Sequence, residues 1–568
     1  MISIVDGYID EPTCLGVPPY ISPYPRYIAG AIWETSHSAR ILYKTIDQIR
    51  INQSIIEEIR KSDIIIVIAG VTVPGKYLSG LPMSPNEIIK YFSDIEKPFK
   101  ILCGPAARYG FGSSGGKHVR DVKTMDNIFN LIIKGDAEVI IPDLLKNGLK
   151  KDEIDDSSCR SDPHQISRYA VRGADICTQH PHYPDSLIAE IETYRGCPRS
   201  ITGGCSFCSE PSKGLPVFRS IKDIISEVEA LYRNSVRHFR LGSQPCLFSY
   251  MAKDTGKEEY PKPDPEAIER LFKGIRSIAP DLLTLHIDNV NPGVVSRYKS
   301  ESKQIIQSII RYHTPGDVAA LGVESVDPVV IKKNNLKASA DEVLEVVELF
   351  NNLGSRRGVN GLPELLPGLN FVFGLIGETK ETYKLDYLFL KSIVDKGLLL
   401  RRINIRQVIP IPGTRMNEIG NRIIKKHKID FHRFKHAVQT HIEHVLLERL
   451  IPKGTILRNI YTEMHEGKVT FGRQIGSYPL LIGIIGTHQL RRFYDVYITD
   501  HGYRSATGIP YPVNINNASS EILEAIPGIG KGRAMRIMMK RPYKSKEEFI
   551  ESLDDKELAA QLTHLITL

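Results

Sequence analysis

The chain has 568 residues, 42% hydrophobic and 25% charged, with a formal net charge of +8. These proportions are typical of a soluble globular protein with two to four domains, and no apolar run approaches the roughly 20 residues of a membrane span. The N-terminal MISIVDGYID lacks a basic segment followed by an apolar core, which excludes a secretory signal there. We therefore expect a cytoplasmic protein, in which clustered cysteines are metal ligands more often than disulfides.

Residues 1–150 are expected to form an α/β domain with a Rossmann-like open sheet. SDIIIVIAG (62–70) and FKILCGP (99–105) have the composition of buried parallel strands, and amphipathic stretches separate such runs. GFGSSG (110–115) fits Gly-x-Gly-x-x-Gly, but no strand directly precedes it, which argues against a dinucleotide site. Residues 151–187 are charged and polar, which is typical of a linker.

Residues 188–452 alternate short strand-like runs with amphipathic helices. Six such repeats up to about residue 416 predict a (β/α)6 partial TIM barrel, and a basic helical extension follows it to residue 452. Residues 401–450 hold 11 Lys or Arg against 4 Asp or Glu. Active sites of such barrels lie at the C-terminal strand ends, so the loops there are the candidate site.

The last 116 residues divide into two segments with different expected secondary structure. Residues 453–515 contain β-like runs between glycine turns, which predicts a small β module, and residues 516–568 are expected to be helical. The stretch 531–546 has seven Lys or Arg and no acid. Localised positive charge favours a polyanionic partner, and the alternative is a solvated helix face.

Three cysteines are crowded into the glycine-rich loop after the first barrel strand: Cys197, Cys205 and Cys208. Three thiolates would hold three irons of a [4Fe–4S] cluster and leave the fourth open. The alternative is a zinc site, with Cys205 and Cys208 as a knuckle completed by Cys177, His180 or His182.

At this point the sequence resembles the radical S-adenosylmethionine (radical SAM) superfamily, with Cys-x7-Cys-x2-Cys in place of the usual Cys-x3-Cys-x2-Cys. RLGSQP, LGVESVDP, FVFGLIGET and IRQVIPIPGTRM match the family's signposts on the second, fourth, fifth and sixth strands. The resemblance implies a [4Fe–4S] cluster on Cys197, Cys205 and Cys208, with SAM on the open iron. It implies SAM contacts by Phe207, Gly242, Ser243, Gln244, Glu324, Ser325, Gly374 and Gly377.

The resemblance also implies an activity, namely reductive cleavage of SAM to methionine and a 5′-deoxyadenosyl radical, with ferredoxin or flavodoxin as the reductant. Gln244 stands where the family often has an acid, and its amide oxygen is expected to accept a hydrogen bond from the SAM ammonium. Glu324 is the expected charged partner of SAM.

Residues 1–150 resemble the cobalamin-binding-like domain that precedes many radical SAM barrels, through LGVPPYISPYPRYIAGAI, ILCGPAAR and IIKGDAEVIIPDLL. The Asp-x-His-x-x-Gly signature that supplies a cobalt ligand is missing, and His37 and His118 lack its context. Cobalamin is therefore left as an open alternative. Similarity to methylthiotransferases leaves a second cluster open, on Cys14 and Cys103 with Cys159 or Cys177, against inert thiols.

AIPGIGKGRAMRIM in the last domain resembles a helix-hairpin-helix, which implies nucleic-acid contacts by Gly528, Gly530, Lys531 and Arg533. The β module loosely resembles the RNA-binding TRAM module, an oligonucleotide-binding-type barrel. The whole chain is similar to archaeal-type radical SAM proteins with this C-terminal motif.

The leading hypothesis is a radical SAM enzyme that methylates or methylthiolates a nucleic acid, with RNA favoured and DNA open. One alternative is a radical SAM methylase or rearrangement enzyme for a small molecule or protein. The other is a nucleic-acid-binding scaffold with a structural cluster.

Overall fold

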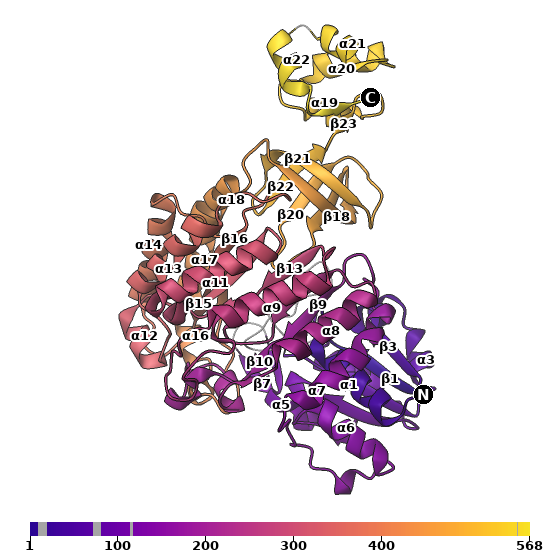
Figure 1. Cartoon of the computed structure of the whole chain (residues 1–568), viewed down its shortest axis with the longest axis vertical. Coiled ribbons are helices and arrows are strands. Elements are labelled where there is room, and N and C mark those ends of the chain that lie inside the picture. Colours follow the sequence, from indigo (N-terminus) through magenta and orange to yellow (C-terminus); the bar gives the residue numbers. More distant parts are fainter. Residues whose placement is uncertain (9–19, 72–80, 114–116, 554) are drawn as a thin grey trace.

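The structure is a computed structural model that describes residues 1–8, 20–71, 81–113, 117–553 and 555–568. Four parts follow one another along the chain (Figure 1): an α/β sheet, a partial barrel, a small closed β-barrel and a C-terminal helical region. None of the helices in the described ranges has the length and hydropathy that a membrane crossing requires.

The N-terminal sheet has five parallel strands in the order β3-β1-β4-β5-β8. They are β1 (Ile2–Asp6), β3 (Ile41–Thr45), β4 (Ile64–Ile68), β5 (Phe99–Cys103) and β8 (Leu131–Ile132). Helices cover both faces, namely α1 (Pro23–Thr35) and α6 (Ala137–Lys146) on one, and α2 (Ile46–Ile51), α3 (Ile55–Ile59), α4 (Pro85–Phe92) and α5 (Pro105–Tyr109) on the other. Burial on both faces explains why β1 and β4 are apolar runs. The order reverses between β1 and β4, where doubly wound sheets bind ligands at the carboxyl ends.

The segment 151–187, expected to be a linker, instead contains α7 (His164–Arg172) and a 3-10 turn (Gly173–Gln179) packed on α1. Two glycines permit this close packing. A Cβ on Gly30 would lie 1.9 Å from the carbonyl oxygen of Tyr169, and one on Gly173 would lie 1.8 Å from that of Arg26.

The partial barrel consists of two four-stranded parallel sheets, β13-β12-β9-β2 and β14-β15-β16-β17, joined where β13 passes into β14. Its strands are β9 (Ile188–Glu192), β12 (His238–Gly242), β13 (Thr284–Ile287), β14 (Asn289–Val290), β15 (Asp317–Glu324), β16 (Leu365–Phe373) and β17 (Arg402–Gln407), with β2 (Tyr20–Ile21) beside β9. Counting β13 and β14 as one interrupted strand, the six expected repeats are present. The covering helices include α8 (Ile221–Arg233), α9 (Pro265–Ile278), α11 (Lys299–Tyr312), α13 (Ala340–Gly354) and α14 (Lys380–Asp395).

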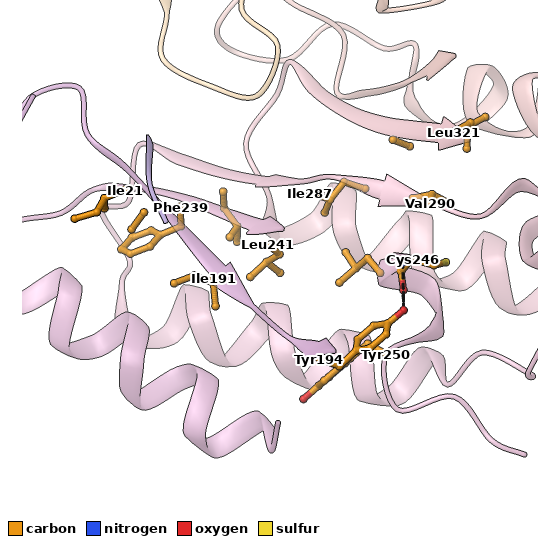
Figure 2. Packing of buried hydrophobic residues seen from close by; sticks show 14 of the residues in the cluster. Ile21, Ile191, Tyr194, Phe239, Leu241, Cys246, Tyr250, Ile287, Val290 and Leu321 are labelled. Atoms are coloured by element: carbon orange, nitrogen blue, oxygen red, sulfur yellow. Dashed lines mark hydrogen bonds between the residues drawn. The ribbon is translucent and has the colours of Figure 1, made fainter. Parts of the chain in front are cut away.

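Alternation along the barrel strands separates an apolar outer face from a polar interior. Ile191, Phe239, Leu241 and Ile287 pack against the helices (Figure 2). The inward positions of the same strands carry charged or polar side chains, all buried: Glu190, Arg240, His286 and Asp288. The main core therefore lies between strands and helices, and the barrel interior is left for polar groups.

Residues 456–510 form a closed five-stranded barrel in the order β18-β19-β20-β22-β21. Its strands are β18 (Ile456–Glu466), β19 (Val469–Gln474), β20 (Leu481–Ile485), β21 (Phe493–His501) and β22 (Ser505–Pro510). β20 and β22 pair in parallel and the other pairs are antiparallel, so the barrel is mixed.

The loop 475–480 of this small barrel enters the bottom of the partial barrel. Thr284 Oγ1 donates to the carbonyl oxygen of Ile475 at 2.9 Å, and Ser477 N donates to His286 Nδ1 at 2.9 Å. Because Thr284 begins β13 and the strands are parallel, the small barrel sits at the N-terminal ends of the strands. It is thus at the opposite end from the loops that follow them (Figure 1).

The basic extension follows the partial barrel and precedes the small barrel along the chain. It consists of helices α15 (Arg415–Ile419), α16 (Arg422–Lys426), α17 (Lys428–Val438) and α18 (His444–Leu450). The last residues have a separate core around β23 (Val513–Asn514), α19 (Ser520–Glu524), α20 (Lys531–Lys540), α21 (Lys546–Glu551), α22 (Lys556–Leu562) and β24 (Ile566–Thr567).

Candidate active site

The three clustered cysteines lie in the loop after β9, at the C-terminal end of the partial barrel, and line one cavity. Local backbone geometry folds this loop tightly. Gly196 has φ +87°, and a Cβ there would lie 2.4 Å from the carbonyl oxygen of Leu215. Cys208 N donates to the carbonyl oxygen of Cys205 at 3.2 Å. The glycine and the turn bring the three thiols to the same wall of the cavity.

The three thiols lie close to one another and beside cations; Cys205 is buried, and Cys197 and Cys208 are partly buried. Burial raises the pKa of Cys197 to about 12, and burial together with the neighbouring thiols raises the pKa of Cys208. Arg199 Nη1 lies 3.1 Å from Cys205 Sγ. Burial alone would lower the pKa of Lys337, but Glu324 and Cys205 outweigh it and raise that pKa. The cations beside the thiols counter the effect of burial and favour the thiolate form that ligates iron, so these residues fit a cluster.

A zinc site does not fit the same region. Over the ranges that the structure describes, no group of three or more His, Cys, Asp or Glu side chains could hold a single metal ion. Cys177 is buried beside Arg26, and His180 packs its ring against Tyr43. A four-iron cluster binds each cysteine at a different corner, so its thiolates are spaced more widely than the ligands of one ion.

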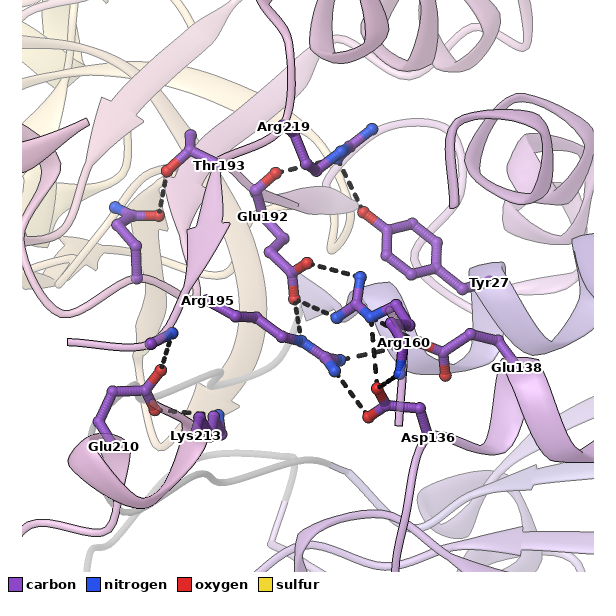
Figure 3. A network of polar contacts seen from close by, with 12 residues as sticks. Tyr27, Asp136, Glu138, Arg160, Glu192, Thr193, Arg195, Glu210, Lys213 and Arg219 are labelled. Carbon is purple, nitrogen blue, oxygen red and sulfur yellow. Dashed lines mark hydrogen bonds and ion pairs between the residues drawn. The ribbon is translucent and has the colours of Figure 1, made fainter. Parts of the chain in front are cut away.

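A buried ion network ties the cysteine loop to the N-terminal domain (Figure 3). Arg195, two residues before Cys197, donates to Asp136 Oδ1 at 2.6 Å and to Glu192 Oε2 at 3.0 Å. Arg160 lies between the same carboxylates, 2.8 Å from Glu192 Oε1 and 3.5 Å from Asp136 Oδ2. The KGDAE segment therefore has a physical role, because it anchors the arginine that precedes the first cysteine.

Of the eight residues expected to contact SAM, the cavity lining includes Phe207 and Glu324. Glu324 sits at a β-bulge with φ +68°, and Lys337 Nζ lies 2.7 Å from its Oε1. The expected charged group is therefore at the cavity, but it already has a cationic partner.

Gln244 and Ser325 lie outside the cavity lining, and their contacts to SAM stay predictions. The Gln244 side chain accepts from Thr193 Oγ1 at 3.2 Å and donates to the carbonyl oxygen of Leu241 at 2.9 Å. The Ser325 hydroxyl donates to Asp386 at 3.1 Å. Both are buried and outside the cavity lining, because the protein interior satisfies their polar groups.

The expected glycines shape loops and do not line the cavity. A Cβ on Gly242 would lie 2.2 Å from Glu190 Oε1, and Ser243 beyond it has φ +57°. Gly374 and Gly377 have φ of +93° and +91° and form a loop that Glu378 closes by accepting from two of its backbone N–H groups.

The cavity-lining residues not foreseen from the sequence include Lys337, Asn370, Asn404, Arg406 and Tyr478. The alternation in RINIRQ, where Asn404 and Arg406 each follow an isoleucine, was a signal for two of them. No sequence signal could find Tyr478, because it reaches the cavity from the loop of a separate barrel.

The N-terminal domain faces this cavity through Val71, which follows β4 and packs with Tyr109 and Ile411. Val71 is thus at the carboxyl edge of the sheet, where a cobalamin would bind. His37 lies before β3, at the other edge, and the side chain of His118 is outside the described part. No histidine side chain in the described ranges of this domain lies at the carboxyl edge, so a histidine-ligated cobalamin does not fit these residues.

The remaining cysteines do not gather into a second cluster site in the described chain. Cys103 and Cys177 are buried in the main core, and Cys159 is exposed. Cys14 lies outside the described residues.

The expected hairpin lies between α19 and α20. Gly528 has φ +82° and packs so closely on Leu558 that a Cβ would lie 2.5 Å from its Cδ1. Gly530 and Lys531 are exposed at the start of α20. Arg533 donates to the carbonyl oxygen of Gly528 at 2.7 Å and pairs with Asp555 at 3.5 Å, so part of its role is to hold the hairpin.

A radical SAM superfamily model matches residues 191–386. An uncharacterized protein of Methanocaldococcus jannaschii is 47% identical over 515 residues, covering 89% of this chain and 92% of that protein. One of Archaeoglobus fulgidus is 40% identical over 561 residues, covering 99% and 98%. Among solved structures, the radical SAM methyltransferase TsrM of Kitasatospora setae is 12% identical, covering 73% of this chain and 74% of TsrM with a TM-score of 0.46.

The superfamily implies an enzyme with a [4Fe–4S] cluster and SAM, and the thiols and cations of the cavity suit both. By its full-length similarity to the two archaeal proteins and its matched barrel, the chain belongs to their family within the radical SAM superfamily.

Proposed function

We propose that this radical SAM enzyme modifies a nucleic acid, RNA in preference to DNA, by methylation or methylthiolation. The bound cluster and SAM would supply hydrogen abstraction from an unactivated carbon. The protein's part is to hold the cluster through its three cysteines, orient SAM in the cavity and keep water away. A ferredoxin or flavodoxin is the proposed reductant.

The observation that carries the proposal is the closed five-stranded barrel joined to a basic helical hairpin. Five-stranded barrels of the oligonucleotide-binding type bind single strands on their surface. The hairpin faces β21 across a hollow lined by Lys453, Gly454, Tyr497 and residues 524–530. Exposed glycine backbone and Lys531 at the start of a helix suit a phosphate group.

The arrangement limits the size of the substrate. The small barrel contacts the N-terminal ends of the barrel strands, whereas the cysteines follow a C-terminal end. A nucleic acid held by the C-terminal modules must therefore extend along the protein to reach the cavity. This favours a long, folded RNA over a short oligonucleotide.

The test combines binding with product analysis. Total tRNA and duplex DNA of similar length are titrated into the parent and Lys531→Glu at several salt concentrations. We expect tighter RNA binding, a linear fall of log affinity with log salt, and weaker binding by the variant. Lys257→Glu reverses the charge of a residue that is 80% exposed on the partial barrel and serves as the control. RNA binding that is absent at low salt, or equal loss in both variants, contradicts the proposal.

A small-molecule substrate is the second candidate, favoured by the amide and charged side chains of Asn370, Asn404 and Arg406 in the cavity lining. In that case Lys531→Glu should leave SAM-dependent product formation from a cell extract unaffected. Nucleoside mass profiles of cells with and without the gene then separate the two candidates, since only an RNA modification changes them.

A further inference from the structure

The last barrel strand, β17, presents a row of polar side chains to the cavity. Asn404 and Arg406 are two residues apart, so they lie on the same face of the strand, and both line the cavity. Asn404 Nδ2 donates to Asn370 Oδ1 on the neighbouring β16 at 3.2 Å. Asn404 precedes Arg406 by two residues, so the amide pair lies roughly 7 Å from Arg406 along the strand, towards its N-terminal end.

The other charged side chains around the cavity have partners. Lys337 pairs with Glu324 at 2.7 Å. Arg199 pairs with Glu259 at 2.6 Å and also contacts Cys205. The Lys337 and Arg199 charges therefore lie on the side of the cavity that holds the cysteines.

Arg406 is different, because its guanidinium forms no hydrogen bond or ion pair with any residue in the described part of the chain. It is only partly exposed, and it lines the same cavity. A partly buried arginine without an ion-pair partner carries a desolvation cost, and an anionic ligand would offset that cost.

Below these groups the cavity is bounded by Tyr478 of the small barrel, whose ring lies against Arg402, 3.8 Å from the guanidinium carbon to the ring centroid. Its hydroxyl donates to Asp288. Tyr478 therefore forms part of the cavity floor below Asn404 and Arg406.

We propose that Arg406 binds an anionic group of the substrate, a phosphate or a carboxylate, and thereby positions the substrate in the cavity. The inference rests on the proposed radical chemistry in this cavity. The guanidinium can bind either anion through two parallel hydrogen bonds. SAM also carries a carboxylate, but SAM must lie against the cluster, where Lys337 and Arg199 provide the nearer positive charge.

The experiment measures binding to the anaerobic, cluster-containing full-length protein by titration calorimetry. The probes are adenosine 5′-monophosphate for the phosphate arm, malonate for the carboxylate arm, and SAM. Variants are Arg406→Gln, Arg406→Lys and Lys337→Gln, with Arg233→Gln on α8, whose side chain is 76% exposed, as the matched control. Iron content and circular dichroism establish that each variant folds.

We expect Arg406→Gln to weaken at least one anion probe tenfold or more, and to weaken it more than SAM. Arg406→Lys should restore part of the affinity, because lysine keeps the positive charge but cannot donate two parallel hydrogen bonds to the anion. Lys337→Gln should weaken SAM binding more than it weakens binding of the anion probes. Arg233→Gln should bind all three probes as the parent does. The probe whose binding Arg406→Gln weakens shows whether the anion is a phosphate or a carboxylate.

Two results would overturn the inference. In one, Arg406→Gln binds both anion probes as tightly as the parent does; in the other, it loses as much SAM affinity as anion affinity. Failure of the nucleic-acid proposal is read separately, from RNA binding by Lys531→Glu. Either inference can therefore fail without the other.

Discussion

The buried carboxylate of Glu227 allows a quantitative prediction about how the N-terminal helix is joined to the barrel. Glu227 on α8 pairs with Arg26 of α1 and with Arg219, and the three side chains are 0%, 0% and 1% exposed. Tyr27 donates a further hydrogen bond to its Oε2 at 3.3 Å. Burial alone would raise the pKa of Glu227, but Arg219 and Arg26 outweigh it and the pKa is lowered.

Glu227→Gln keeps the size of the side chain and removes its charge, leaving two buried guanidiniums without their carboxylate. Removing one partner of a buried ion pair costs about 3–5 kcal/mol. The matched control is Glu229→Gln on the same helix, where Glu229 and Arg233 are 40% and 76% exposed. A pair of that kind contributes about 0–1 kcal/mol.

The assay is urea unfolding of the iron-free chain, followed by fluorescence. The chain has one tryptophan, and Trp33 lies on α1 together with Arg26, so the signal reports on this junction. Because the folded pKa of Glu227 is below its unfolded value, its contribution is present at neutral pH and lost as pH falls through the acid range. The parent and Glu227→Gln should therefore converge in acid. Equal effects of the two substitutions at neutral pH would refute the reasoning.

Three further predictions concern the cysteines, a buried acid and the inserted loop. Alanine at any of the three clustered cysteines should abolish iron binding and SAM cleavage, whereas Cys246→Ser, in the same cavity but accepting from Asn291 N, should keep the parent's iron content. Burial raises the pKa of Asp386 to about 8, so the folded chain holds this proton, and stability should fall as pH rises towards 8. Asp386→Asn should flatten that dependence in melting temperatures measured from about pH 5 to pH 8, between the unfolded and the folded pKa; an unchanged slope contradicts it. Gly476→Ala would place a Cβ 2.6 Å from His286 Cε1 and should make the loop 475–480 more sensitive to protease; an unchanged cleavage rate contradicts this.

Local patterns determined much of this architecture. Apolar runs such as Ile64–Ile68 become strands buried on both faces, because parallel sheets are covered by helices on each side. The cysteine loop after the first barrel strand has to lie at the C-terminal end, since that follows from chain order alone. Spacing and chain order therefore sufficed to predict the cavity wall that carries the three thiols.

Tertiary structure decided which polar groups face the cavity. Gln244 lies next to the expected site in sequence, yet Thr193 and Leu241 satisfy its amide inside the protein. Arg406 and Tyr478 line the cavity from a distant strand and a separate barrel, and local sequence does not report such contacts. The fit of the loop 475–480 against Thr284 and His286 decides at which end of the partial barrel the small barrel docks. That fit is a matter of shape and of hydrogen bonds across nearly 200 residues, so only the folded chain reveals it.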